Sequence, residues 1–161
     1  MLKTIKLSIS LVFISSLLNN HVLAEINNNI KDNISSVKAN MHRLQTMVET
    51  HGVEWKELYP NNIEDLKIEA EKITKFGGYW KEFKNPFTGK IGINGSLIDY
   101  EFYKSYKGNI SDLNGMVLYK SFECEKTNLA DRKLCRIYKI WGTDEKGQII
   151  KQEQDFYLSN N

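Results

Sequence analysis

The chain has 161 residues, which is the length of one domain. It carries 22 basic and 20 acidic residues, but Lys3 and Lys6 stand in residues 1–24, a segment without any acidic residue. Without these two lysines, 20 basic residues balance 20 acidic ones. The balance excludes a general electrostatic attraction to nucleic acid or to an anionic membrane as the basis of function, and we expect no nucleic-acid partner.

The first 24 residues have the three-part layout of a secretory signal peptide. The two lysines precede an apolar stretch broken only by serines, Leu7–Leu18, and the small or apolar residues Val22–Ala24 stand before Glu25. We expect cleavage at this point, a secreted or periplasmic protein without a membrane span, and a single domain over residues 25–161. The alternative is a retained membrane anchor, but a spanning helix needs about 20 apolar residues, and the polar residues Asn19–His21 interrupt this one.

A long amphipathic helix is predicted next, after a polar lead-in at Glu25–Asn29. Apolar residues recur at intervals of three and four, which places them on one stripe of a helix: Ile30, Ile34, Val37, Met41, Leu44 and Val48. The pair His51-Gly52 is typical of a helix end. Because the stripe covers fewer than three heptads, we expect the helix to pack on a sheet rather than to form a coiled coil.

A short second helix is predicted after Tyr59-Pro60, a pair that stops the first one. Asn61 or Asn62 can cap it, and the acidic pair that follows lies in the first turn, where the helix dipole favours negative charge. Its apolar face consists of Ile63, Leu66, Ala70 and Ile73, and Gly77-Gly78 ends it.

Four strands complete a predicted α+β fold. Aromatic and β-branched residues with partial alternation mark Leu97–Lys104, Gly115–Phe122, Cys135–Gly142 and Gln148–Glu153. Turn residues separate the first two strands at Ser105–Gly115 and the last two at Thr143–Gly147. Because helices precede strands, we expect the two helices to pack on an antiparallel sheet of about four strands.

The only two cysteines, Cys124 and Cys135, are expected to form one disulfide. An exported chain keeps disulfides, and an even count at short spacing favours an intrachain bridge. A metal site would need further ligands, and the histidines are distant in sequence, so we expect no metal and no cofactor. The basic residues near the second cysteine are interpreted as a solvated strand edge and loop: Arg132, Lys133, Arg136 and Lys139.

No catalytic motif stands in the sequence: there is no G-x-S-x-G, Walker loop, H-E-x-x-H or G-x-G-x-x-G, and we expect no enzymatic activity. Asp99 and Glu101 are two residues apart, which places them on one face of the predicted strand. They could form an acid–base pair or bind a cation, but a solvated face is the favoured interpretation. His42 and His51 are nine residues apart, which places them on opposite sides of a helix. The tryptophans are interpreted as packing residues: Trp55, Trp80 and Trp141.

The segment GGYWKEFKNPFTGKIG, residues 77–92, is interpreted as a structural corner. Pro86 fixes φ after Asn85, which suits a tight turn, and Gly89 gives the chain freedom to enter the sheet. Together with Pro60 and Gly147, these are the expected structural turn residues.

Four segments share one order along the chain. They are the helix VKANMHRLQTMVETHG, the turn and helix YPNNIEDL, the corner GGYWKEFKNPFTGK, and the strand GMVLY followed by YKIWGTDEKGQII. In this order they resemble the globular domains of bacterial type II secretion pseudopilins and type IV pilins, over most of residues 34–152. The resemblance implies a pilin-like fold, partners among secretion or pilus components, and a disulfide that staples a C-terminal loop.

The chain departs from that family at its N-terminus and in its cysteine loop. The family's subunits begin with a leader cut after glycine, followed by an apolar helix of about 20 residues. Here no glycine precedes Gly52, so we expect no such leader, and the apolar stretch is too short for such a helix. The calcium site of the major secretion subunits is not expected either, because the cysteine loop holds only Glu125 and Asp131 as acids.

We therefore expect a secreted or periplasmic, non-catalytic, pilin-like protein-interaction module. It would bind through the cysteine-stapled loop, the turn at Ser105–Gly115 and exposed aromatic residues. The first alternative is a membrane-anchored pseudopilin or pilin subunit of a secretion or pilus filament. The second is a small secreted enzyme or inhibitor, which a pocket grouping Asp99, Glu101 and a histidine would favour.

Overall fold

The computed structural model describes residues 2–72, 78–126 and 133–160, with side chains from Val22 onward. The chain divides into two units, residues 1–33 and 34–161. The described part of the first unit is helical and belongs to α1 (Leu2–Glu54), so the predicted lead-in at Glu25–Asn29 is helix rather than coil. The predicted signal peptide at residues 1–24 stays a prediction, because most of its side chains lie outside the described residues. Within the described part, no helix has the length and apolar character needed to cross a membrane.

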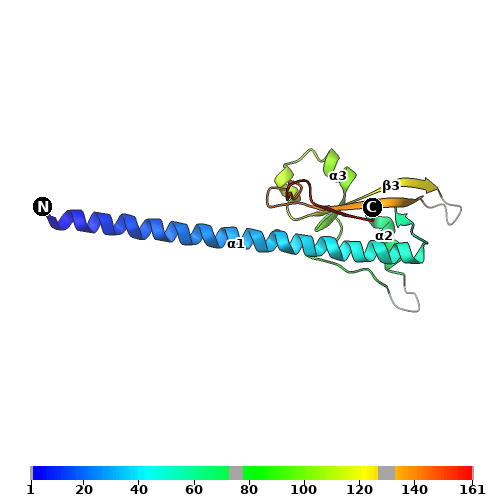
Figure 1. Cartoon of the computed structure of the whole chain (residues 1–161), viewed down its shortest axis with the longest axis horizontal. Coiled ribbons are helices and arrows are strands. Elements are labelled where there is room, and N and C mark those ends of the chain that lie inside the picture. The colour runs from blue at the N-terminus through cyan, green and yellow to red at the C-terminus, as the bar shows by residue number, and fades with distance from the viewer. Residues whose placement is uncertain (1, 73–77, 127–132, 161) are drawn as a thin grey trace. The chain divides into compact units, whose positions relative to one another are not determined.

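The second unit contains the end of α1 and all other elements in a mixed α+β arrangement (Figure 1). In chain order they are β1 (Tyr59–Pro60), α2 (Ile63–Ala70), β2 (Leu97–Asp99), α3 (Tyr100–Ser105), the 3-10 helix η1 (Ile110–Leu113), β3 (Val117–Lys126), β4 (Lys133–Gly142) and β5 (Tyr157–Ser159). The sheet order is β1-β4-β3-β2, and β5 also pairs with β4. Every pair is antiparallel except β2 with β3, which is parallel. The predicted α+β class is confirmed at this level.

One face of the sheet packs against α1 and forms the main core (Figure 1). The predicted stripe supplies four fully buried side chains from α1: Val37, Met41, Leu44 and Val48. They share this core with Val117 and Tyr119 of β3 and with Tyr138 and Ile140 of β4. Burying one large aliphatic side chain stabilises a fold by about 1.5–3 kcal/mol, so this layer holds the second unit together. We call this side of the sheet the inner face.

The opposite side of the sheet, the outer face, carries a smaller apolar cluster. Ile98, Leu118 and Trp141 are buried there, and Tyr100 and Tyr103 of α3 pack against them. Alternation along each strand explains the division, since Leu118 points away from the inner residues Val117 and Tyr119.

Helix α1 continues past its predicted end at His51-Gly52 to Glu54. Gly52 is buried, and a Cβ there would lie 2.7 Å from the ring of Tyr59. The glycine therefore permits close packing and does not cap the helix. Lys56 and Glu57 make the turn that follows, with left-handed φ values of 57° and 64°.

Helix α2 begins where its sequence predicts. Asn62 is the N-cap, and its side-chain oxygen accepts a hydrogen bond from the backbone N–H of Asp65 at 2.8 Å. The helix ends at Ala70, whose carbonyl accepts from the N–H groups of Tyr79 and Trp80 at 2.8 and 3.2 Å. Ile73 and Gly77, which the prediction included, lie outside the described residues.

Two of the four predicted strands are wrong in part. Only Leu97–Asp99 of the first is a strand, and it pairs in parallel with β3. Its second half is α3, because Tyr100 and Tyr103, three residues apart, both pack on the outer face as neighbours on a helix do. The predicted strand Gln148–Glu153 forms only isolated bridges, at Ile149 and Lys151. Its place beside β4 is taken by β5.

Candidate functional site

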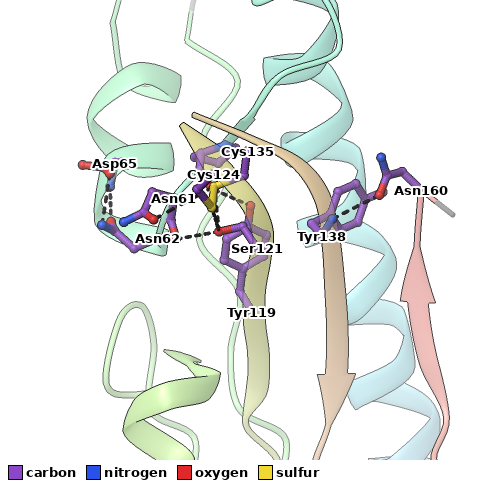
Figure 2. The surroundings of a disulfide bond; sticks show 10 residues. Asn61, Asn62, Asp65, Tyr119, Ser121, Cys124, Cys135, Tyr138 and Asn160 are labelled. Atoms are coloured by element: carbon purple, nitrogen blue, oxygen red, sulfur yellow. Dashed lines mark hydrogen bonds between the residues drawn. A yellow bond between two sulfur atoms is a disulfide. The ribbon is translucent and has the colours of Figure 1, made fainter. Parts of the chain in front are cut away.

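The predicted disulfide between Cys124 and Cys135 is present and joins β3 to β4, with an S–S distance of 2.04 Å (Figure 2). The two cysteines are directly paired in the sheet, and Cys135 also pairs with Tyr59 of β1. Neither sulfur is a free thiol, so neither is available as a nucleophile. Most of the loop between the two cysteines, residues 127–132, lies outside the described residues.

Side chains of β3 tie the disulfide to the segment that links α1 and α2 (Figure 2). The Ser121 hydroxyl donates to the carbonyl of Asn61 at 2.8 Å and lies 3.1 Å from the Cys135 sulfur. The buried Tyr119 hydroxyl donates to the carbonyl of Pro60 at 2.6 Å. Pro60 itself lies in β1, an edge strand, where the missing N–H of proline is tolerated. This end of the sheet is therefore held together by polar contacts and one covalent bond.

Asp99 and Glu101 do not share a strand face, because Glu101 belongs to α3. The Asp99 carboxylate accepts from the N–H of Ile63 at 3.2 Å, and burial raises the pKa of this carboxyl. Glu101 forms an ion pair with Lys120 at 2.6 Å. Both acids line a pocket of about 290 Å³ beside the disulfide.

Neither histidine lines that pocket. His42 is exposed, whereas His51 is buried, and its Nδ1 lies 3.0 Å from the carbonyl of Leu58. The two histidines thus differ in environment, and the structure does not bring either one to the acidic pair.

The tryptophans occupy separate packing sites. Trp55 stacks on the ring of His51 with centroids 5.7 Å apart, and Trp80 donates to Glu82 at 3.0 Å. Trp141 is 8% exposed and packs on Tyr100 with centroids 4.6 Å apart.

Asn85 organises a tight turn. Its side-chain oxygen accepts from the N–H groups of Phe87 and Thr88 at 2.9 and 3.2 Å. Pro86 precedes these two residues in the turn, and Gly89 follows them. Gly89 has a φ of 74°, and its N–H donates to the carbonyl of Asn85 at 2.9 Å. Such side-chain-to-backbone bonds are the reason that asparagine favours turns.

The loop before β3 packs against the Asn85 turn, and the turn after β4 packs against that loop. The Asn85 amide donates to the carbonyl of Asn114 at 2.8 Å. The buried Thr143 hydroxyl donates to the carbonyl of Leu113 at 2.6 Å and accepts from the N–H of Met116 at 2.8 Å. Gly147, with a φ of 76°, lies so close to the backbone of Ile110 that a Cβ would overlap its carbonyl. Contacts between residues far apart in sequence therefore fix the loop before β3.

This packing leaves a groove of about 680 Å³ between the Asn85 turn and the loop that follows α3. Its apolar lining is Ile98, Phe102, Leu113 and Met116, and charged groups stand at Lys90 and Asp112. Phe102 is 47% exposed. The hydroxyl of Tyr106 donates to Asp112 at 3.1 Å, and this hydrogen bond raises the pKa of Tyr106. We call this feature the loop groove.

The sequence predicts a binding role for the Ser105–Gly115 part of the loop groove, but not for the other residues that line it. The sequence pattern predicts a strand at Phe102 and only a local turn at Asn85. The exposed side of α3 could have been found from the pair Phe102 and Tyr106, which are four residues apart and lie with ring centroids at 5.8 Å.

The predicted basic cluster is not a strand edge. Arg132 lies outside the described residues, and Lys133 and Arg136 are exposed. Strand β4 is central, with β3 along one side and β1 and β5 along the other. Lys139 lies in the middle of β4, with its ammonium 4.3 Å from the centroid of the Tyr157 ring.

Among the described residues, no group of three or more histidine, cysteine, aspartate or glutamate side chains is placed to hold a metal ion. No protein-family model, curated protein or solved structure matches the chain. The resemblance to pilins and pseudopilins therefore stays a prediction.

Proposed function

We propose that the chain is an exported, non-catalytic, pilin-like protein-interaction module. The mixed α+β fold, with a long N-terminal helix against a mostly antiparallel sheet, supports the proposal, since the sequence resemblance implies that arrangement. Its expected place is the periplasm or the extracellular space, where the disulfide would persist.

The loop groove is the observation that carries the proposal. Three turns are held in place on a rigid, packed sheet. Proteins commonly build binding sites from loops positioned in this way. The groove lining combines apolar side chains with the charged residues Lys90 and Asp112, and Phe102 presents an aromatic side chain to solvent. Aromatic residues inside a polar rim are enriched at the centres of protein interfaces.

Photo-crosslinking in the producing cell tests the proposal. A benzoylphenylalanine at Phe102, in the loop groove, should crosslink to a protein other than this chain, to be identified by mass spectrometry. The matched control carries the same group at Glu64, which is exposed on α2. Equal crosslinking from both positions would contradict a specific groove, and crosslinks only to a second copy would favour self-assembly.

The second candidate is a membrane-anchored pseudopilin or pilin subunit. Three apolar side chains of α1 in the first unit favour it, because they are largely exposed: Val22 at 52%, Leu23 at 58% and Ile26 at 49%. In a filament, such residues would pack against helices of neighbouring subunits. Fractionation with intact-mass measurement separates the candidates. A mature protein that begins at Glu25 in the soluble fraction would contradict the anchored subunit.

A further inference from the structure

Two lysines lie directly opposite each other on the outer face of the sheet. Lys120 of β3 pairs in register with Lys139 of β4. Lys120 is two residues from Leu118, and Lys139 is two residues from Trp141. Because residues two apart on a strand share a face, both lysines lie on the same face as the outer cluster. The Cβ atoms of residues directly opposed in an antiparallel pair lie about 4.5–5.5 Å apart. Two ammonium groups are therefore anchored close together on one surface.

Like charges in opposed positions destabilise a sheet, so this pair needs compensation. Aromatic rings supply part of it: the Lys120 ammonium lies 5.1 Å from the Phe122 centroid and 5.5 Å from that of Tyr100. Lys139 lies 4.3 Å from the centroid of Tyr157. An ammonium within about 6 Å of a ring centroid is attracted to the ring face. The rings thereby hold both lysines at the surface of the sheet.

Among the described residues, only one of the two lysines has a carboxylate partner. Glu101 binds Lys120 at 2.6 Å, and the Glu101 side chain is 70% exposed. Within the described part of the chain, Lys139 contacts the Tyr157 ring and has no ion-pair partner. The surface therefore keeps one uncompensated positive charge beside an ion pair that an incoming carboxylate can also approach.

Each ring around the lysines already makes a contact through one face, although Tyr157 remains 44% exposed. Tyr100 packs on Trp141 with centroids 4.6 Å apart, and Trp141 is 8% exposed. One face of Phe122 lies against Lys120, and one face of Tyr157 lies against Lys139. A sugar ring would need an open aromatic face to stack on, whereas an acidic side chain needs only the ammonium groups and an apolar border. The geometry favours charge recognition over stacking.

We infer that this surface binds an acidic segment of a partner protein, with an aspartate or glutamate carboxylate against Lys139. The lysine-pair surface consists of Tyr100, Lys120, Phe122, Lys139 and Tyr157. The inference rests on the proposed function, since both require a protein partner. It adds the chemistry of that partner and a surface separate from the loop groove.

Fluorescence anisotropy with a labelled hexaglutamate peptide and the full chain tests the inference. Measurements at about 10 mM salt keep screening weak, because the Debye length is then about 30 Å. Lys139→Gln should weaken binding about three- to fivefold. Lys146→Gln removes the same charge from an exposed turn residue and serves as the matched control. Glu101→Gln should tighten binding about two- to fivefold, because it removes the competing carboxylate. Its matched control is Glu153→Gln, at an exposed position.

Equal weakening by Lys139→Gln and Lys146→Gln would overturn the inference, and so would equal tightening by the two glutamate variants. The Glu101→Gln arm is a gain of affinity, which a misfolded variant would not produce. Hexagalacturonate carries carboxylates on sugars, and tighter binding of that probe would overturn the assignment to a peptide. If hexaglutamate does not bind while a crosslinker at Phe102 still captures a protein, this inference fails and the proposed function stands.

Discussion

The two faces of the sheet are built for different tasks. The inner face meets α1 through side chains that are fully buried, such as Leu44 and Ile140. The outer face buries Leu118 and Trp141 but leaves two lysines and several aromatic rings near solvent. Adjacent residues of the same strands thus serve stability on one side and present charge on the other. Because α1 covers the inner face, we expect binding surfaces on the outer face and in the loops beside it.

The largest effect should come from the inner face. We expect Ile140→Ala to lower the free energy of unfolding by about 3–5 kcal/mol, because the fully buried side chain leaves a cavity against α1. Ile137→Ala makes the same change in the same strand at a half-buried position, and the loss should be at most about half as large. Urea unfolding followed by circular dichroism measures both. Similar losses would break the distinction between the faces.

The disulfide should contribute next, because it fastens the end of the sheet where β1, β3 and β4 meet. We expect the double substitution of Cys124 and Cys135 by alanine to cost about 3 kcal/mol, the loop-closure value for a loop near this size. Dithiothreitol should lower the melting temperature of the wild type and leave that of the double variant unchanged. A wild type that melts identically under both conditions would contradict this role.

Two glycines with nearly the same φ separate backbone strain from steric overlap. Gly147 and Gly89 have φ values of 76° and 74°. A Cβ at Gly147 would overlap the carbonyl of Ile110, whereas one at Gly89 would meet only the flexible Lys84 side chain at 3.3 Å. We expect Gly89→Ala to cost about 1 kcal/mol and Gly147→Ala about 2–3 kcal/mol. Equal losses in thermal unfolding would show that the contact with Ile110 does not hold the loop groove in place.

The smallest effect should be a pH dependence from Asp99. Burial raises the pKa of this carboxyl above its ordinary 3.8, so the folded state holds its proton to higher pH than the unfolded state does. Stability from this group should therefore fall as pH rises from about 3.8 through the raised pKa. Asp99→Asn keeps the acceptor for the Ile63 N–H and should lack this component. The difference between the two unfolding profiles measures it, and a difference that grows in the opposite direction would contradict the assignment.

Local patterns are enough to predict which side of α1 packs on the sheet. Of the six residues that the helical period places on one stripe, the structure buries Val37, Met41, Leu44 and Val48 and leaves Ile30 and Ile34 half-buried. The cysteine count led to the correct disulfide. Helix α3 was missed because Tyr100 and Tyr103 have strand propensity, and only packing on the outer cluster selects the helix.

Tertiary contacts decide the remaining features. The loop groove depends on Asn85 and Thr143, which bind backbone groups about thirty residues away in sequence, and no local pattern announces such bonds. The lysine pair could have been found: once Cys124 opposes Cys135 in an antiparallel pair, counting back four residues on one strand and forward four on the other places Lys120 opposite Lys139.

Phe102→Ala tests most directly whether binding and stability belong to different parts of the molecule. The crosslinker is placed at Ser111, an exposed residue that also lines the loop groove. We expect the variant to unfold within about 0.5 kcal/mol of the wild type while the yield of the crosslinked partner in the producing cell falls sharply. A partner captured in undiminished yield, or a variant that loses its fold together with the partner, would contradict the assignment of binding to the loop groove.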